Sequence, residues 1–204
     1  MRIGIFPGSF NPIHIGHLSI ANYIAEFEGY DEVWFLITPQ NPTKNKSELL
    51  PEQLRFDLLE KSIKGYKKFK SCTIEWTLPK PTYTITTLQK LRILHPEHNF
   101  ELIIGSDNWE IFHRWKDYQR ILNNFKVCIY PRRGSHKIYP SHPNTKMIKA
   151  PIVEVSSSFI RKCMTSGKDV RFFMPSGIYE TLLKEKAFES ENISKEIENK
   201  DEKD

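Results

Sequence analysis

The sequence is poor in the features that mark membrane, secreted and metal-finger proteins. None of its 204 residues falls in an apolar run approaching the roughly 18 residues that a membrane-spanning helix needs. The three cysteines, Cys72, Cys128 and Cys163, are odd in number and widely spaced, which argues against a disulfide framework or a zinc knuckle. No signal peptide is visible at the start. We therefore expect a cytoplasmic protein with reduced thiols and no membrane partner.

A dense basic patch is also missing. The net charge is +5, but residues 189–204 hold seven acidic residues against three lysines, so this end carries −4 and residues 1–188 carry +9. The lysines and arginines form no stripe interleaved with aromatics, so no nucleic-acid partner is expected, and a small anionic substrate explains the basic body equally well. The acidic end predicts a disordered tail, which leaves one domain at residues 1–188.

The hydrophobic pattern alternates between strand-like and helix-like segments. Helical patterns occupy residues 18–27, 51–63 and 84–94. Short apolar or β-branched runs, which indicate strands, occur at residues 3–6, 32–38, 73–77, 100–104, 126–130 and 147–153. This alternation predicts an α/β fold, a Rossmann-like doubly wound parallel sheet. Ligands of such sheets bind at the carboxyl ends of the strands.

The most informative stretch lies between the first strand and the first helix. Residues 8–17 read GSFNPIHIGH. Backbone N–H groups of such a loop and the following helix N-terminus attract a phosphate. His14 and His17 are three residues apart and can donate to the same phosphate, while Gly8 and Gly16 are expected to let the ligand approach the backbone. No Gly-Lys-Ser/Thr follows, so this is not a Walker A loop.

A second anion site is predicted at residues 155–161, which read VSSSFIR. Several serines before an apolar-periodic run are typical of a helix N-terminus, whose hydroxyls and free N–H groups can bind a phosphate. Arg161, one turn into the helix, adds a positive charge. Taken alone this is an ordinary capped helix, but together with the two histidines it is a strong signal for an anion-binding site.

Further polar residues follow other predicted strands. Asp107, just beyond a strand, suits recognition of a nucleotide's ribose. Trp115 offers a ring on which a pyridinium can stack. Arg133 can clamp a phosphate, and Lys44 lies in a loop with two prolines. Arg55, in the second helix, is interpreted as a surface or ion-pair residue.

These segments together resemble a known superfamily. The HIGH sequence at residues 14–17 is similar to the (H/T)xGH signature of the nucleotidyltransferases, whose core resembles that of class I aminoacyl-tRNA synthetases, and VSSSFIR resembles their triphosphate-binding I-S-S-T-x-I-R motif. YTITTL at 83–88 and GSD at 105–107, followed by F-x-x-W, resemble the nicotinate-nucleotide adenylyltransferase family. The chain departs from the family at Asn11 and Thr86, where the family commonly has Asp.

The resemblance implies transfer of AMP from ATP to nicotinate mononucleotide, giving deamido-NAD and pyrophosphate. It implies Mg²⁺ held by the ATP phosphates and no protein metal site. The catalytic residues implied are His14, His17, Lys44 and Arg161. The ATP-binding residues implied are Gly8, Ser9, Phe10, His14, Gly16, His17, Gly105, Asp107, Ser156, Ser157 and Arg161. The mononucleotide-binding residues implied are Asn11, Lys44, Thr84, Trp115 and Arg133.

Three questions stay open at this point. A pantetheine-phosphate adenylyltransferase is the alternative within the class, and a non-catalytic nucleotide- or RNA-binding module is the alternative outside it. The sequence does not decide between nicotinate and nicotinamide mononucleotide. It also leaves open whether the protein forms a homo-oligomer.

Overall fold

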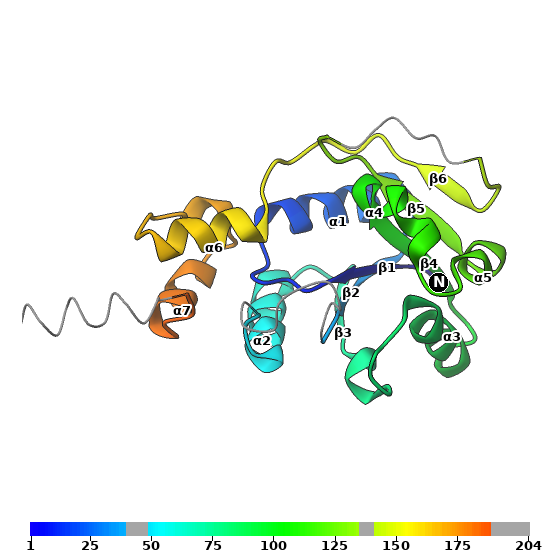
Figure 1. Cartoon of the computed structure of the whole chain (residues 1–204), viewed down its shortest axis with the longest axis horizontal. Helices are drawn as coiled ribbons and strands as arrows, with labels where there is room; N and C mark the ends of the chain where they lie inside the picture. Colours follow the sequence, from blue (N-terminus) through cyan, green and yellow to red (C-terminus); the bar gives the residue numbers. More distant parts are fainter. Residues whose placement is uncertain (40–48, 135–140, 189–204) are drawn as a thin grey trace, which may run out of the picture.

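The computed structural model describes residues 1–39, 49–134 and 141–188 (Figure 1). Lys44 and the predicted acidic tail lie outside these ranges. The strands are β1 Arg2–Gly8, β2 Glu32–Ile37, β3 Phe69–Cys72, β4 Asn99–Gly105, β5 Lys126–Tyr130 and β6 Thr145–Met147. The α-helices are α1 Ile15–Phe27, α2 Glu52–Ile63, α3 Thr84–Leu94, α4 Ser106–Glu110, α5 Tyr118–Asn124, α6 Ser157–Thr165 and α7 Ile178–Lys184. Short 3₁₀ helices are η2 Ile74–Thr77, η3 Phe112–Arg114 and η4 Arg171–Phe173.

The six strands form one sheet in the order β3-β2-β1-β4-β5-β6, with every neighbouring pair parallel. The predicted doubly wound parallel sheet is confirmed. The chain winds outward in one direction from β1 and in the other from β4, so the switch point lies between these two strands. Their carboxyl ends, Gly8 and Gly105, open onto the same edge of the sheet.

Helices cover both faces of the sheet, and each face buries its own apolar cluster. Alternate residues of β1 point to opposite faces, as strand geometry requires. Phe6 packs with Ile20 and Ile24 of α1, Leu58 and Leu59 of α2, and residues of α6 and α7. The other face packs Ile3 and Ile5 with Leu88 and Leu91 of α3 and Ile121 of α5. Figure 1 shows α6 and α7 grouped at one end, beside the carboxyl edge.

Two predicted strands were wrong in position. Residues 74–77 form η2, after a strand that ends at Cys72. Glu75 turns inward there: the residue is 4% exposed, and its carboxylate accepts hydrogen bonds from the hydroxyls of Thr87 (2.7 Å) and Thr82 (3.2 Å). The last strand covers Thr145–Met147 rather than residues 147–153. Pro151, inside the predicted range, has no N–H to donate to a ladder.

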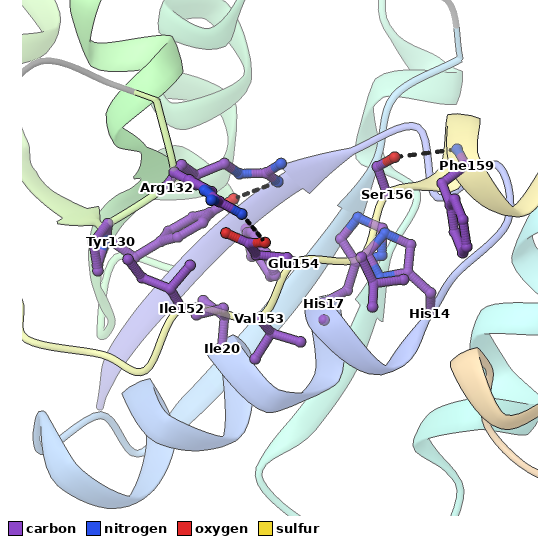
Figure 2. A pocket seen from close by; sticks show the side chains of 15 residues that line it. His14, His17, Ile20, Tyr130, Arg132, Ile152, Val153, Glu154, Ser156 and Phe159 are labelled. Carbon is purple, nitrogen blue, oxygen red and sulfur yellow. Dashed lines mark hydrogen bonds and ion pairs between the residues drawn. The ribbon is translucent and has the colours of Figure 1, made fainter.

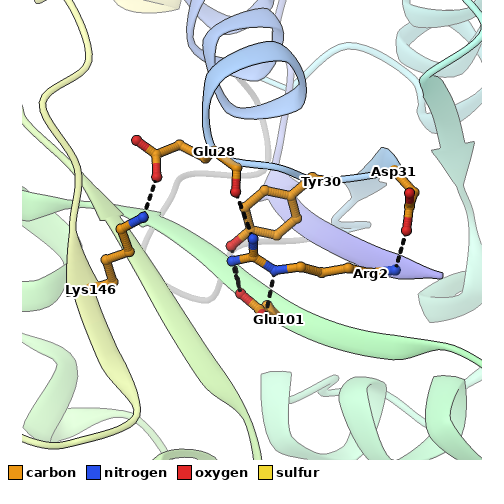
Figure 3. A network of polar contacts seen from close by, with 6 residues as sticks. All are labelled: Arg2, Glu28, Tyr30, Asp31, Glu101 and Lys146. Carbon is orange, nitrogen blue, oxygen red and sulfur yellow. Dashed lines mark hydrogen bonds and ion pairs between the residues drawn. The ribbon is translucent and has the colours of Figure 1, made fainter.

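A polar network closes the amino end of the sheet (Figure 3). The guanidinium of Arg2 donates two hydrogen bonds of 2.8 Å to the carboxylate of Glu101, which is 6% exposed. The hydroxyl of Tyr30 donates to the same carboxylate at 2.7 Å. Burial raises the pKa of Glu101, but the hydrogen bonds from Arg2 and Tyr30 outweigh it and the net pKa is lowered. The network therefore joins β1 to β4 at the end opposite the ligand edge.

Candidate active site

A cavity of about 330 Å³ opens at the carboxyl edge, between the loop after β1, the end of β5 and the start of α6 (Figure 2). One side presents the rings of His14 and His17, and the other presents Tyr130 and Arg132. The remaining lining residues are Phe6, Gly16, Ile20, Pro131, Arg133, Ile152, Val153, Glu154, Val155, Ser156 and Phe159. A cavity with two imidazoles and a guanidinium on its walls is suited to an anionic ligand.

The two histidines form a stacked pair. Their ring centroids are 3.7 Å apart with 25° between the planes. His14 is the N-cap of α1, and its carbonyl accepts the backbone N–H of His17 at 3.0 Å, which fixes both residues on the first turn. His14 is 3% exposed, and burial, followed by the charge of Arg132, lowers its pKa to about 3. His14 is therefore neutral at pH 7 in the free protein.

The glycines of this loop are explained by packing. A Cβ on Gly8 would lie 2.7 Å from the ring of Phe10, and a Cβ on Gly16 would lie 3.0 Å from Nδ1 of His14. The loop thus has glycine where its own side chains come close, rather than only where a ligand would approach the backbone. Phe10 is 1% exposed and its ring lies against Phe35 and His17, so only the backbone of this predicted ATP-binding residue can face the cavity.

The start of α6 is hydrogen-bonded to the loop between β1 and α1, residues 9–14, which we call the histidine loop. Ser156 is the N-cap of α6, and its hydroxyl accepts the N–H of Phe159 at 3.1 Å. The hydroxyl of Ser157 donates to the carbonyl of Pro12 at 2.9 Å, and Arg161 donates to the carbonyl of Asn11 at 3.0 Å. The structure therefore brings together two motifs that are about 140 residues apart in the sequence. Ser156 lines the cavity.

The side chains of Asn11 and Arg55 hold the loop after β1 through hydrogen bonds to backbone groups. Asn11 is 2% exposed, and its side-chain oxygen accepts the N–H of Leu50 at 3.0 Å, so the side chain is used within the protein. Arg55 is fully buried and its guanidinium donates to the carbonyls of Ser9 (2.7 Å), Thr38 (2.9 Å), Leu50 (3.1 Å) and Pro39 (3.1 Å). The interpretation of Arg55 as a surface or ion-pair residue was wrong, because four backbone carbonyls converge on it.

Arg132, one residue before the predicted Arg133, lines the cavity beside Tyr130, and Arg133 lines it as well. The guanidinium of Arg132 donates to the Tyr130 hydroxyl at 3.2 Å and lies 3.7 Å from the Asp107 carboxylate. Arg133 is mostly exposed and pairs with Glu154 at 2.6 Å on the cavity rim. Sequence reasoning missed Arg132, Tyr130 and Glu154. Two adjacent arginines after a strand gave no sign of which would face inward.

The end of β4 supports the same wall. Gly105 is the N-cap of α4, and a Cβ there would lie 2.3 Å from Oδ1 of Asp107 and 3.2 Å from Nε of Arg132. The hydroxyl of Ser106 accepts the backbone N–H of Arg132 at 2.8 Å, which joins the ends of β4 and β5. Gly105 and Asp107 thus lie beside the cavity without being part of its lining.

Thr84 and Trp115 lie in a neighbouring region. Thr84 begins α3, with Tyr83 as the N-cap, and Trp115 follows η3 and packs on Phe112 with ring centroids 5.1 Å apart. Lys116 places its ammonium 4.5 Å from the centre of the Tyr83 ring, so the two segments meet. Neither Thr84 nor Trp115 lines the cavity that holds the histidines.

The fold and the site define a nucleotidyltransferase-type protein, and comparison with known proteins gives the same class. The cytidylyltransferase-like family matches residues 5–163, so the chain belongs to this family. Within the family, the chain is 62% identical over 179 residues to a "Probable nicotinate-nucleotide adenylyltransferase" of Azobacteroides pseudotrichonymphae, covering 87% of this chain and 94% of the relative. A protein of the same name from Bacteroides fragilis is 48% identical over 90% of this chain and 92% of its own length. These identities identify the chain as a member of the nicotinate-nucleotide adenylyltransferases.

Solved structures show the same fold. The nicotinic acid mononucleotide adenylyltransferase of Plasmodium falciparum, complexed with NaAD, superposes with a TM-score of 0.76 over 92% of this chain and 97% of that chain, at 21% identity. In the described residues, no helix is long and apolar enough to cross a membrane.

Proposed function

We propose that this chain transfers AMP from ATP to nicotinate mononucleotide, forming deamido-NAD and pyrophosphate in NAD biosynthesis. The observation that carries the proposal is the convergence of the two histidines, Ser156 and Arg132 on one cavity, in a chain 62% identical to a relative with that name. A cytoplasmic location, predicted from the sequence, goes with this proposal.

The reaction requires the two substrates to be held in the correct geometry, and it requires no proton transfer. The 5′-phosphate of the mononucleotide is already an anionic nucleophile at neutral pH, and it attacks the α-phosphorus of ATP as the bond to pyrophosphate breaks. Holding the two reactants in line supplies a large part of the acceleration. The remaining task is to stabilise negative charge on the α-phosphate and on the leaving pyrophosphate.

We assign that task to the walls of the cavity. The neutral His14 ring has its buried Nδ1 without a hydrogen-bond partner among the described residues, so the N–H is best carried on Nε2, as a donor to a phosphate oxygen. His17, stacked on it, is the proposed donor to the α-phosphate in the transition state. The N-terminus of α6, with Ser156, Ser157 and Arg161, is proposed to bind the phosphates of ATP. Lys44 is proposed to contact the phosphates as well.

The nucleotidyl transfer uses a divalent cation with ATP, and we propose Mg²⁺. The carboxylates at this edge are occupied by arginines: Glu154 pairs with Arg133 at 2.6 Å, and Asp107 lies 3.7 Å from Arg132. That arrangement fits an ion held mainly by triphosphate oxygens and water, since Mg²⁺ keeps several waters and accepts few protein ligands. When bound, the cation neutralises part of the charge on the phosphates.

For the mononucleotide we propose the edge between α3 and η3. Thr84 at the start of α3 and Trp115 after η3 lie on segments that meet through the contact of Lys116 with Tyr83. Arg132 lies near this edge, because its guanidinium is 3.7 Å from the Asp107 carboxylate. We therefore propose Arg132, rather than Arg133, for the phosphate of the mononucleotide, since Arg133 is paired with Glu154.

The test is pyrophosphate release from ATP and Mg²⁺ with nicotinate mononucleotide, nicotinamide mononucleotide or phosphopantetheine offered separately. We expect fast release with the first alone. Equal rates with the first two would keep the reaction and remove the selectivity for nicotinate. Release only with phosphopantetheine would favour the alternative adenylyltransferase. No release with any of them, together with salt-sensitive RNA binding, would favour a non-catalytic module.

The role of His17 has its own test. His17→Ala should lower kcat far more than it weakens ATP binding, because the proposed hydrogen bond strengthens only in the transition state. His95→Ala, at the opposite edge of the sheet and outside the cavity lining, is the control. Equal losses in kcat and ATP affinity, or no loss, would remove His17 from this role.

A further inference from the structure

A second group of ligand-type side chains lies at the opposite edge of the sheet from the cavity. His95 directly follows α3, and Glu97 and His98 lie just before β4. The seven residues of β4 separate this group from Gly105 at the carboxyl edge, a length of about 23 Å at roughly 3.3 Å per residue. The group therefore has no part in the proposed adenylyl transfer.

The three side chains bring their donor atoms together. Nε2 of His98 lies 3.3 Å from Oε1 of Glu97, and Nδ1 of His95 lies 3.9 Å from the same oxygen. All three ligand atoms are within 4.8 Å of one another. Ligand atoms around a tetrahedral Zn²⁺ with bonds of about 2.1 Å are about 3.4 Å apart. The His98–Glu97 pair already has this spacing, and His95 needs to move by roughly 1 Å.

The two imidazoles are held in place by their surroundings. The rings are nearly parallel, at 7°, with centroids 5.8 Å apart. The backbone N–H of His98 donates to the carbonyl of His95 at 3.1 Å, closing a tight turn. The edge of Trp34 meets both rings, with centroids 5.5 Å from His95 and 6.3 Å from His98. Glu97, whose side chain is 60% exposed, is free to adjust toward an ion.

The donor set selects the kind of ion. Two imidazole nitrogens with one carboxylate oxygen suit Zn²⁺, Co²⁺, Ni²⁺ or Cu²⁺, whereas Mg²⁺ and Ca²⁺ prefer oxygen ligands alone. In the described part of the chain, the Glu97 carboxylate contacts the two histidines and pairs with no lysine or arginine. The Met1 amino group donates to the backbone carbonyl of Glu97 at 3.5 Å, so it is a positive charge near the group.

We propose that His95, Glu97 and His98 form a site for one divalent transition-metal cation, with water completing its coordination. The site is distinct from the Mg²⁺ that accompanies ATP. It also places the ion next to the indole of Trp34, which provides a spectroscopic reporter for this site.

The experiment is a titration of the full chain, without nucleotide, with Zn²⁺ by calorimetry and with Ni²⁺ by tryptophan fluorescence. We expect one Zn²⁺ per chain at this site and quenching of Trp34 by Ni²⁺, with no response to Mg²⁺. His95→Asn and Glu97→Gln should each weaken Zn²⁺ binding about 10- to 100-fold, since even residues that only support a ligand have effects of this size. Trp34→Phe should remove most of the Ni²⁺ quenching while leaving Zn²⁺ binding.

The control is His113→Asn, another exposed histidine, which should bind Zn²⁺ as the unsubstituted chain does. Zn²⁺ binding unchanged in His95→Asn and Glu97→Gln would place the ion elsewhere, and absence of binding would equally overturn the proposal. Pyrophosphate release by His95→Asn is measured alongside and should stay unchanged, so failure of this site and failure of the adenylyltransferase proposal are distinguishable.

Discussion

Arg55 provides the sharpest test of how the histidine loop is held. Its buried guanidinium is the shared donor to carbonyls from three segments: the loop after β1, the chain leaving β2, and the segment that leads into α2. Burial lowers the pKa of Arg55, and the charge of Glu52 opposes that effect. The four hydrogen bonds from Arg55 to backbone carbonyls stabilise its buried positive charge and also hold the loop after β1 in place.

The size of the effect follows from the acceptors. In Arg55→Met, the carbonyls of Leu50 and Pro39, whose hydrogen bonds are buried, lose their partner, at about 1–3 kcal/mol each. The partly buried carbonyls of Ser9 and Thr38 can turn to water, and removing a buried charge returns part of the loss. We expect a net loss of about 3 kcal/mol, which for a chain of this length is a fall in Tm of about 6–12 °C.

Urea unfolding and pyrophosphate release measure the two consequences. Arg55→Lys, which keeps a charge but has fewer donors, should lie between Arg55→Met and the unsubstituted chain. The matched control is Arg114→Met, at an exposed position, expected to change stability by less than about 0.5 kcal/mol. Activity of Arg55→Met should fall at temperatures where it is still folded, because the loop loses its anchor at Ser9. Stability equal to that of Arg114→Met would refute the reasoning.

Three further predictions concern pH, the amino end of the sheet and the cavity wall. The pKa of His14 is about 3 in the folded chain, mainly through burial, against about 6.5 unfolded, so stability should fall by about 2 kcal/mol from pH 7 to pH 5, and urea melts of His14→Gln should show a smaller fall. Glu101→Gln breaks the paired hydrogen bonds from Arg2 and should cost about 3 kcal/mol at pH 7. Since the folded pKa of Glu101 is lowered, its advantage over the variant should shrink in melts below pH 4.5, and a constant difference would contradict this. Gly105→Ala would place a Cβ 2.3 Å from Asp107, so the KM for ATP should rise with stability nearly kept, and an unchanged KM would remove Asp107 from the ATP site.

The parts of the fold that were predicted well are those set by local pattern. The helices at residues 18–27, 51–63 and 84–94 lie within or nearly match α1, α2 and α3. The parallel sheet followed from the alternation of strands and helices. The third strand was misplaced because the apolar-polar alternation of residues 73–77 is also compatible with a turn in which Glu75 points inward, toward hydroxyls that arrive from α3.

The sequence by itself determined the fold class, and it predicted an anion-binding site at the loop after the first strand. The spacing of His14 and His17 and the serines before Arg161 are local facts, and a helix N-terminus binds anions wherever it is placed. Only the tertiary structure decided which side chains line the cavity. It turned Arg132 into the cavity and Arg133 to Glu154, buried Phe10 and Arg55, and directed the Asn11 side chain to the backbone of Leu50. The reason is physical: the direction of a side chain and the partners of a buried carbonyl depend on segments distant in the sequence, and these meet only when the sheet is assembled.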